Sequence, residues 1–347
     1  AIRIVAGDEN VDSLLVIFIP PMAVRTEDVA EEIIRATSEL KGRIPVMTNF
    51  MAAKGISGQL SDGHVRIPSY PFPEDAAKAL AHAVRYGQWL TEPSGVMRTF
   101  PHLRRLEAAA IVSKALAGGG GWLDPDEASR FLDCYGIPIA KSQMASSPRD
   151  AARVAGTFSG KVVLKASAPG LLHKTEMGAV KVGLTKDQVE AAAREMAESL
   201  HKAGIAGATF LIQEMVPDAV EMFVGVTNDP NFGPLIACGA GGALVELLRD
   251  VSVRLTPVTD LDARQMVRSL RTFPILEGYR GGPRQDIEAL EEVLLRVGQM
   301  VEDIPEIAEL DLNPLMVRRG GDGAVVVDAR VRIAESTPEL PLGAKKR

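Results

Sequence analysis

Residues 162–180 restrict the fold of this chain more than any other part of the sequence. An apolar run ends at Lys165, a loop rich in Ala, Ser, Pro and Gly follows, and a second apolar run begins after Gly178. Short apolar runs bounded by glycine and proline are typical of buried strands. The segment therefore predicts two strands joined by a loop, with an ammonium group at the edge of the first strand.

The polar residues of this segment suggest a phosphate site. A lysine at a strand end, such as Lys165, can bind phosphate as a point charge. The loop carries His173 and Lys174, and a loop histidine can act as a nucleophile that accepts a phosphoryl group. An ordinary hairpin whose surface loop happens to hold these residues is the alternative interpretation.

Charge, hydropathy and cysteine content exclude several classes of protein. The formal net charge of −6 argues against nucleic-acid binding. No apolar stretch reaches the length of a membrane span, so we expect no membrane association. Cys134 and Cys238 lie in apolar contexts, which predicts buried free thiols in the reducing cytoplasm. The sequence has no Cys/His cluster of the kind that binds zinc.

The first 90 residues read as half of a doubly wound α/β unit. The apolar run 14–19 predicts a buried strand, and 26–36 predicts a capped amphipathic helix. Two further strands are expected at 44–50 and 65–68, followed by a helix over 75–90. The chain opens with Ala rather than Met, so we expect a start in mid-domain and either a fragment or one part of a longer polypeptide.

Residues 91–121 are expected to contain a linker and one helix. Proline and glycine are frequent in 91–101, and 103–117 reads as a helix ended by four consecutive glycines, 118–121. The glycine run predicts a flexible hinge rather than a phosphate loop, because no strand precedes it and no Lys-Ser/Thr follows. We expect this region to make few long-range contacts.

Three motifs downstream of Lys165 carry candidate nucleotide contacts. A strand ends at Glu214, whose carboxylate and following backbone through Val216 could hold adenine; a solvated strand-end Glu is the alternative. Glu221 could bridge two ribose hydroxyls, or it could be a salt-bridged strand residue. Gly239, Gly241 and Gly242 follow an apolar strand, and such a loop lets backbone N–H groups approach an anion, although a lone glycine loop is a weak signal.

The segment 309–315 predicts a cation site. Glu309, Asp311 and Asn313 fall on one face of a strand, where three oxygen-bearing side chains are costly unless they bind a cation or face solvent. Asp328 on the next strand adds a carboxylate. Hard oxygen ligands from two adjacent strands suit Mg²⁺, which usually takes a few protein oxygens plus nucleotide phosphates. A polar hairpin face is the alternative.

An early Lys, a strand-end Glu, a second Glu and a terminal Asn/Asp pair match the order of parts in an ATP-grasp fold. Residues from about 122 to 333 resemble the ATP-grasp domain of nucleoside-diphosphate-forming acyl-CoA synthetases, a group that contains ADP-forming acetate–CoA ligase and is related to succinyl-CoA synthetase. The resemblance is carried by segments 135–138, 163–165, 172–174, 224–234, 239–242, 254–255, 279–281 and 309–315.

The resemblance implies an α/β protein with a partial flavodoxin-like doubly wound domain followed by an ATP-grasp domain. Residues 1–90 look like the C-terminal part of the flavodoxin-like CoA-ligase domain of fused members. The expected boundaries are then 91–121 for the linker and helix, 122–334 for the ATP-grasp domain and 335–347 for a tail.

The resemblance also assigns roles, with ATP/ADP and Mg²⁺ as cofactors. The residues it assigns are His173 as the phosphate acceptor, Asp311 as an acidic residue near the phosphohistidine, Lys165 and Lys174 at phosphate, Glu214, Val216 and Glu221 at adenine and ribose, Asn313 and Asp328 at magnesium and, on weaker grounds, Arg254 at phosphate.

The implied activity is that of an ADP-forming acid–CoA ligase. The chain lacks a Gly-rich Rossmann opening and an upstream phosphohistidine loop, so the acyl substrate and CoA are expected to act through missing or partner domains, in an oligomer or a longer chain. One alternative is a non-catalytic regulatory module of an acetyltransferase-type fusion, against which His173, Asn313 and Asp328 argue. Another is a carboxylate–amine ligase, which needs no phosphohistidine.

Overall fold

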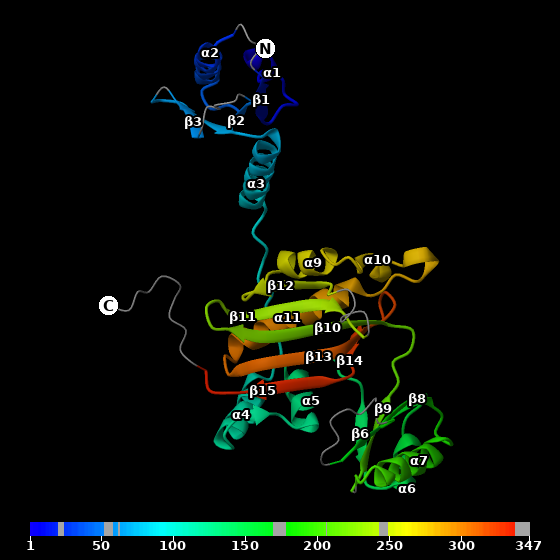
Figure 1. The fold of residues 1–347 in the computed structure, drawn as a ribbon. Coiled ribbons are helices and arrows are strands. Elements are labelled where there is room, and N and C mark those ends of the chain that lie inside the picture. The colour runs from blue at the N-terminus through cyan, green and yellow to red at the C-terminus, as the bar shows by residue number, and fades with distance from the viewer. Residues whose placement is uncertain are drawn as a thin grey trace. The chain divides into compact units, whose positions relative to one another are not determined.

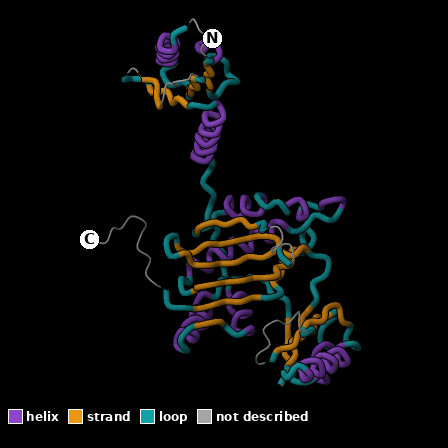
Figure 2. Tube along the Cα trace, in the orientation of Figure 1, coloured by secondary structure: helices purple, strands orange, loops and turns teal. Residues whose placement is uncertain are grey.

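A computed structural model describes residues 1–19, 24–51, 58–61, 63–168, 178–205, 207–242 and 249–336. The chain divides into two compact units, Ala1–Ser94 and Gly95–Arg347 (Figure 1). The first unit holds one sheet, and the second holds two sheets with their own helices (Figure 2). None of the helices among the described residues is long and apolar enough to cross a membrane.

The first unit is built on a largely parallel sheet with the strand order β1-β2-β4-β3. Its elements are α1 (Ile2–Val5), β1 (Leu14–Phe18), α2 (Thr26–Ser38), β2 (Val46–Phe50), β3 (Gly58–Ser61), β4 (Arg66–Tyr70) and α3 (Pro73–Thr91). Strand β2 pairs in parallel with β1 and β4, and β3 adds an antiparallel edge. Ile33, Phe50 and Ile67 form part of its core. The expected half of a doubly wound fold is confirmed, with β3 as an additional strand.

A large antiparallel sheet dominates the second unit, with the order β12-β11-β10-β13-β15-β5 and β14 paired to β13. Its strands are β5 (Gly121–Trp122), β10 (Val220–Asp229), β11 (Gly233–Ala240), β12 (Val251–Leu255), β13 (Ile307–Val317), β14 (Ala324–Val326) and β15 (Ala329–Ile333). The helical elements that accompany it are α4 (Arg105–Ala117), α5 (Pro125–Cys134), α9 (Asp260–Arg268), α10 (Phe273–Leu276), η1 (Tyr279–Gly281) and α11 (Ile287–Asp303).

One face of the large sheet forms the main core. Met222 and Val224 of β10 and Leu310 and Leu312 of β13 are buried in one cluster with residues of α4, α5, α9 and α11. The residues between them in each strand project to the other face, because side chains alternate along a strand. Cys134 and Cys238 are buried and free, which confirms that prediction.

The second sheet of this unit is smaller and has the order β6-β9-β7-β8. Its elements are β6 (Ser142–Ala145), α6 (Pro148–Ala155), β7 (Val162–Ser167), β8 (Val180–Leu184), α7 (Val189–Lys202) and β9 (Thr209–Glu214). Strands β7 and β8 are antiparallel neighbours, which confirms the predicted strand–loop–strand unit. Leu164, Phe210 and Ile212 pack with residues of α6 and α7 on one face.

The glycine run 118–121 is not a hinge between units, which corrects the sequence-based expectation. Helix α4 buries Ala108, Ile111 and Val112 in the main core. After it, the Gly120 N–H donates to the Ala115 carbonyl, and Gly121 pairs with Ile333 of β15. Gly119, Gly120 and Gly121 have positive φ angles, from 74° at Gly120 to 115° at Gly121. Their backbone conformation ends α4 and starts β5 within one packed unit.

The second unit already begins to pack at Gly95. A Cβ atom on Gly95 would collide with the Thr259 side chain at the start of α9. The Val96 N–H donates to the Asp260 carboxylate at 2.7 Å, and the Asp260 N–H donates to the Val96 carbonyl at 3.1 Å. The connection between the units therefore ends at Gly95, much earlier than the glycine run.

This boundary makes a prediction for limited proteolysis. A broad-specificity protease should cut first near residues 92–95, because α3 ends at Thr91 and the packing of the second unit begins at Gly95, and should leave a resistant fragment that starts near Gly95. Mass spectrometry of the fragments under native conditions identifies the cut. Early cleavage by a broad-specificity protease within 118–121 would contradict the boundary.

Two glycines of the run offer a matched pair of stability variants. Both have positive φ, but a Cβ atom at Gly120 would lie 2.8 Å from the Ile333 carbonyl oxygen, whereas one at Gly119 would meet nothing within 4 Å. Gly119→Ala should cost about 1–2 kcal/mol of unfolding free energy through backbone strain alone. Gly120→Ala should cost a further ~1–3 kcal/mol through overpacking. Denaturant unfolding measures both, and equal losses would contradict the close approach of β15.

Candidate functional site

The face of the large sheet opposite the main core carries a row of three oxygen-bearing side chains. Glu309, Asp311 and Asn313 of β13 alternate with the buried Leu310 and Leu312, as the spacing in the sequence predicts. Asp311 pairs with Gly225 of β10 on one side and with Arg330 of β15 on the other. The row therefore lies near the centre of the sheet rather than at its edge.

Asn313 and Asp328 lie opposite each other on adjacent chain segments. The Asn313 N–H donates to the Asp328 carbonyl at 3.0 Å, and the Val327 N–H donates to the Pro314 carbonyl at 2.9 Å. Asp328 lies between β14 and β15, both of which pair with β13. The amide of Asn313 and the carboxylate of Asp328 are thus held on neighbouring backbones, and both residues are exposed.

Burial and neighbouring charges both act on the carboxylate of Asp311. Burial raises the pKa of the Asp311 carboxyl; Arg330 opposes the shift, and the negative charges of Asp328 and Glu309 add to it. Glu309 is itself paired with Arg332 at 3.3 Å. A cation near Asp311 and Asp328 would relieve the repulsion between their carboxylates.

The donor set fits magnesium in particular. Amide and carboxylate oxygens are hard ligands, and Mg²⁺ characteristically takes one or two carboxylates and completes its shell with waters and phosphates. Within the described ranges no three His, Cys, Asp or Glu residues are grouped closely enough to bind a metal by themselves. A magnesium ion held by Asn313 and Asp328 would complete its shell with waters or with the oxygens of a phosphate ligand.

Lys165 lies on the face of the small sheet that its helices leave uncovered. Its neighbours Leu164 and Ala166 point into the core with α6 and α7, so alternation turns Lys165 to the other side. Lys165 pairs with Leu211 of β9, two residues before Gln213. Lys165 and Gln213 therefore share one face of this sheet.

Gln213 joins the two sheets of the unit. Its Nε2 donates to the Val327 carbonyl at 2.8 Å, directly beside Asp328. The face that carries Lys165 therefore meets the chain segment that carries Asn313 and Asp328. Sequence reasoning missed Gln213, because its role depends on the strand pairing and only its position next to Glu214 marks it in the sequence.

Glu214 lies differently from what its predicted role suggests. It is exposed at the end of β9, and alternation turns it away from the face of Gln213 and Lys165. It lines a hollow of about 580 Å³ together with Lys141, Phe158 and Lys161, among others. Its N–H donates to the Lys141 carbonyl at 2.8 Å. Val216 follows, half-buried, in the connection to β10.

Glu221 and the predicted glycine loop come together at the ends of β10 and β11. The Gly241 N–H donates to the Glu221 carbonyl at 2.7 Å, and a Cβ atom on Gly242 would lie 2.5 Å from the Glu221 carboxylate. These residues line a hollow of about 260 Å³ with Thr272 and Ile275 of the α10 region. Sheet packing already explains Gly241, whose N–H is occupied.

Gly239 has a packing role as well. It lies inside β11, where a Cβ atom would be 2.5 Å from both the Asp250 carbonyl oxygen and the Phe223 ring. Gly239 is therefore required by the close approach of its neighbours, independently of any phosphate.

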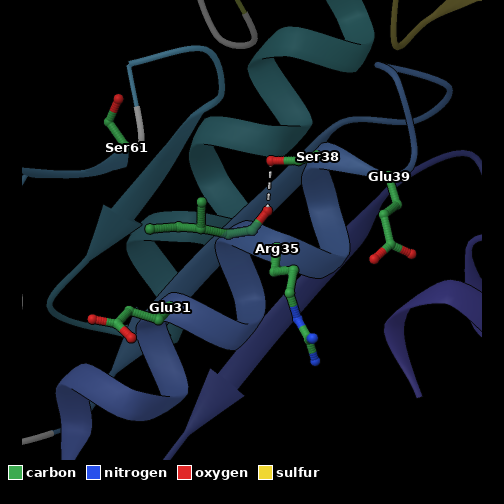
Figure 3. A pocket seen from close by; sticks show the side chains of 6 residues that line it. Glu31, Arg35, Ser38, Glu39 and Ser61 are labelled. Atoms are coloured by element: carbon green, nitrogen blue, oxygen red, sulfur yellow. Dashed lines mark hydrogen bonds between the residues drawn. The ribbon is translucent and has the colours of Figure 1, made fainter.

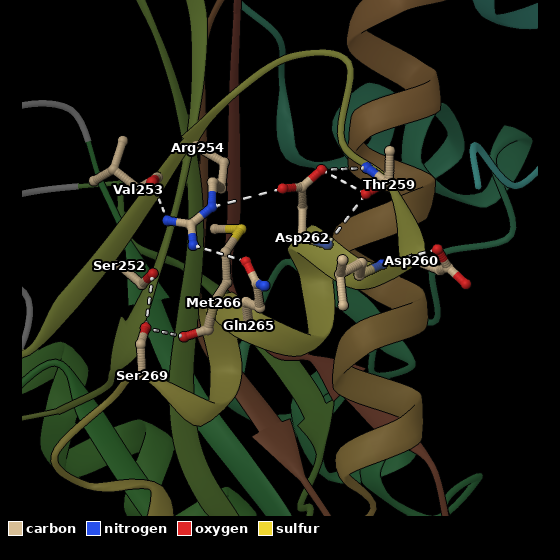
Figure 4. Close-up of polar contacts among 10 residues, drawn as sticks. Ser252, Val253, Arg254, Thr259, Asp260, Asp262, Gln265, Met266 and Ser269 are labelled. Carbon is tan, nitrogen blue, oxygen red and sulfur yellow. Dashed lines mark hydrogen bonds and ion pairs between the residues drawn. The ribbon is translucent and has the colours of Figure 1, made fainter. Parts of the chain in front are cut away.

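Arg254 makes its described contacts on the other face of the large sheet, and its predicted contact with phosphate stays a prediction. It pairs with Ile236 of β11, a residue of the main core, so its side chain lies on the helix-covered face. Its guanidinium group lies 3.7 Å from the Asp262 carboxylate and 3.5 Å from the Gln265 side chain on α9 (Figure 4). Arg254 thus connects β12 to α9 on the side of the sheet away from Asp311.

His173 and Lys174 lie outside the described residues, so their predicted roles rest on the sequence alone.

A hollow in the first unit is lined mainly by polar surface residues of α2. About 570 Å³ in volume, it lies along α2 and is lined by Glu31, Ile34, Arg35, Ser38, Glu39 and Ser61 (Figure 3). Arg35 is paired with Glu32, Glu39 is paired with Arg3, and the Ser38 hydroxyl donates to the Ile34 carbonyl. Two of its charged groups, those of Arg35 and Glu39, are therefore engaged in surface ion pairs.

Comparison with known proteins matches residues 114–333 to the ATP-grasp domain family. The chain is 33% identical over 330 residues to the 4-hydroxybutyrate–CoA ligase (ADP-forming) of Nitrosopumilus maritimus, covering 93% of this chain and 46% of that protein. It is 38% identical over 231 residues to the acetate–CoA ligase (ADP-forming) II subunit beta of Pyrococcus furiosus, covering 65% of this chain and 97% of that subunit.

A solved structure agrees with these relatives. One chain of the Ca. Korarchaeum cryptofilum dinucleotide forming acetyl-coenzyme A synthetase 1, in complex with coenzyme A and Mg-AMPPCP, is 36% identical with a TM-score of 0.57. The match covers 65% of this chain and 100% of that chain. The chain spans about half the length of the longer relatives, 46% and 48% for two of them. This protein therefore belongs to the ADP-forming acid–CoA ligases and carries their ATP-grasp domain.

Proposed function

We propose that this chain transfers a phosphoryl group between ATP and His173, as the nucleotide-handling part of an ADP-forming acyl-CoA synthetase. The observation that carries the proposal is the junction at Gln213, where the face with Lys165 meets the segment with Asn313 and Asp328. The ammonium group of Lys165, which can bind phosphate, and the oxygen ligands for a metal thus lie on two surfaces that contact each other. This combination suits a metal–nucleotide complex.

Different residues bind different parts of the nucleotide. Lys165 binds the phosphates, Asn313 and Asp328 hold the magnesium ion, and Glu221 binds the ribose. The segment from Glu214 to Val216 binds the base, through its backbone rather than through the Glu214 carboxylate that faces the other way. When bound, magnesium neutralises part of the negative charge on the phosphates.

His173 acts as the nucleophile in this proposal. Its imidazole nitrogen forms a bond to the terminal phosphorus atom while the bond from that atom to the bridging oxygen breaks, and ADP leaves. Lys174 pairs with the added negative charge, and Asp311 accepts the remaining imidazole N–H and so orients the ring. The reverse reaction returns the phosphoryl group to ADP.

The synthesis of acyl-CoA requires parts that this chain is not proposed to supply. In the Korarchaeum enzyme a phosphohistidine segment points towards the nucleotide site in one structure and has a site I orientation in another. By analogy, a phosphorylated His173 loop carries its phosphate to a second centre, where the acid and CoA react. We expect that centre in a partner subunit or in further domains, within an oligomer located in the cytoplasm.

Labelling with ATP tests whether His173 is the phosphate acceptor. Incubation with γ-labelled ATP and Mg²⁺ should give label that is stable to base and labile to acid, as expected of phosphohistidine. His173→Ala should bind ATP within about two-fold of the parent chain and incorporate no label, because only the nucleophile is lost. His201→Ala, a change on α7, is the matched control and should label normally. Acid-labile label on the His173 variant would refute the assignment.

The metal ligands make a separate prediction. Asp328→Ala should slow phosphorylation by at least about 100-fold, which corresponds to about 2.7 kcal/mol of transition-state stabilisation. Raising the Mg²⁺ concentration should restore part of the rate. Glu309→Gln, on the same face but paired with Arg332, should change the rate less than about three-fold. Equal losses in the two variants would indicate a general effect of charge rather than coordination.

A further inference from the structure

Gln213 is a buried polar residue on the face of the small sheet that α6 and α7 do not cover. Only 3% of its surface is exposed, and it lies in β9 between Ser142 of β6 and Val163 of β7. Its strand neighbour Ile212 points into the core with α6 and α7. A buried amide is costly unless its polar atoms have partners, so each of its contacts requires an explanation.

One end of the Gln213 amide has a partner in the other sheet. Nε2 donates to the Val327 carbonyl at 2.8 Å. Because a carbonyl can only accept, this contact fixes which end of the amide is the nitrogen. The Val327 N–H in turn donates to the Pro314 carbonyl, so the Val327 peptide is held from both sides. Asn313 precedes Pro314, and Asp328 follows Val327.

The other end of the amide has none. Oε1 is buried and has no hydrogen-bond partner among the described residues. An apolar side chain of similar length would avoid this unpaired acceptor. A Gln at this position is therefore poorly explained by stability alone, whereas its Nε2 contact fixes the position of a functional segment.

We propose that Gln213 is a positioning residue of the metal–nucleotide site. Through Val327 it sets the location of Asn313 and Asp328 relative to the face that carries Lys165, so that the metal ligands and the phosphate-binding lysine serve one ligand. This inference rests on the proposed function and adds a residue that touches neither metal nor phosphate. Its loss should weaken metal binding more than nucleotide binding.

Direct metal binding tests the inference without measuring activity. Gln213→Met keeps the length of the side chain and removes the donor; Gln143→Met, on the exposed neighbouring strand β6, is the control. With ADP present, electron paramagnetic resonance should show Mn²⁺ binding at least five-fold weaker in the Gln213 variant and unchanged in the control. ADP affinity without metal should change less than two-fold.

Hydrogen exchange provides a second readout in the ligand-free chain. The Val327 and Asn313 amides should exchange several-fold faster in Gln213→Met, while the amides of α7 exchange as in the parent chain. Gln213→Glu, which retains the size but presents oxygens to the Val327 carbonyl, should act in the same direction if the Met variant folds poorly.

The outcomes separate the inference from the proposed function. Unchanged Mn²⁺ affinity in a folded Gln213 variant would overturn the positioning role and leave the proposed function intact. An equal fall in metal and ADP affinity, with faster exchange throughout the unit, would show a purely structural role. A parent chain that binds neither ADP nor Mn²⁺ would contradict the proposed function itself.

Discussion

The two-residue period of β10 and β13 is the constraint on which the rest of the second unit depends. These strands are neighbours in the large sheet, and their fully buried apolar residues face one core. The same alternation sends Glu221, Asp311 and Asn313 to the opposite face. A shift of one residue in either strand would bury these polar groups and expose the leucines, so the core fixes the register that assembles the site.

The proposed site lies where this polar face meets a second, smaller sheet. Helices α6 and α7 cover one side of that sheet and leave Lys165 and Gln213 on the other. The contact from Gln213 to Val327 then joins the two sheets beside Asp328. Strands on both sides position the Lys165 ammonium group and the oxygen ligands. The predicted phosphate acceptor, His173, belongs to the connection between β7 and β8.

The sequence predicted most elements of this fold because their patterns are local. The apolar run before Lys165 and the spacing of Glu309, Asp311 and Asn313 follow from residues near each other in the chain. The cap expected at the start of α2 is absent, because the N-cap position is Arg25, which makes no side-chain cap hydrogen bond. Strand pairing is not local, so the sequence could not reveal that Gln213 shares a face with Lys165 or that Arg254 faces α9. The glycines at 118–121 were misread because positive φ and flexibility have the same sequence signal.

We propose that both sheets contribute to one magnesium–nucleotide site. Hydrogen exchange measured by mass spectrometry with and without Mg²⁺ and a non-hydrolysable ATP analogue tests it most directly. We expect slower exchange in peptides containing 162–167 and in peptides containing 311–316 and 327–329, and only when nucleotide and metal are both present. Protection confined to one sheet, or to the hollow beside Lys141 and Phe158, would contradict it.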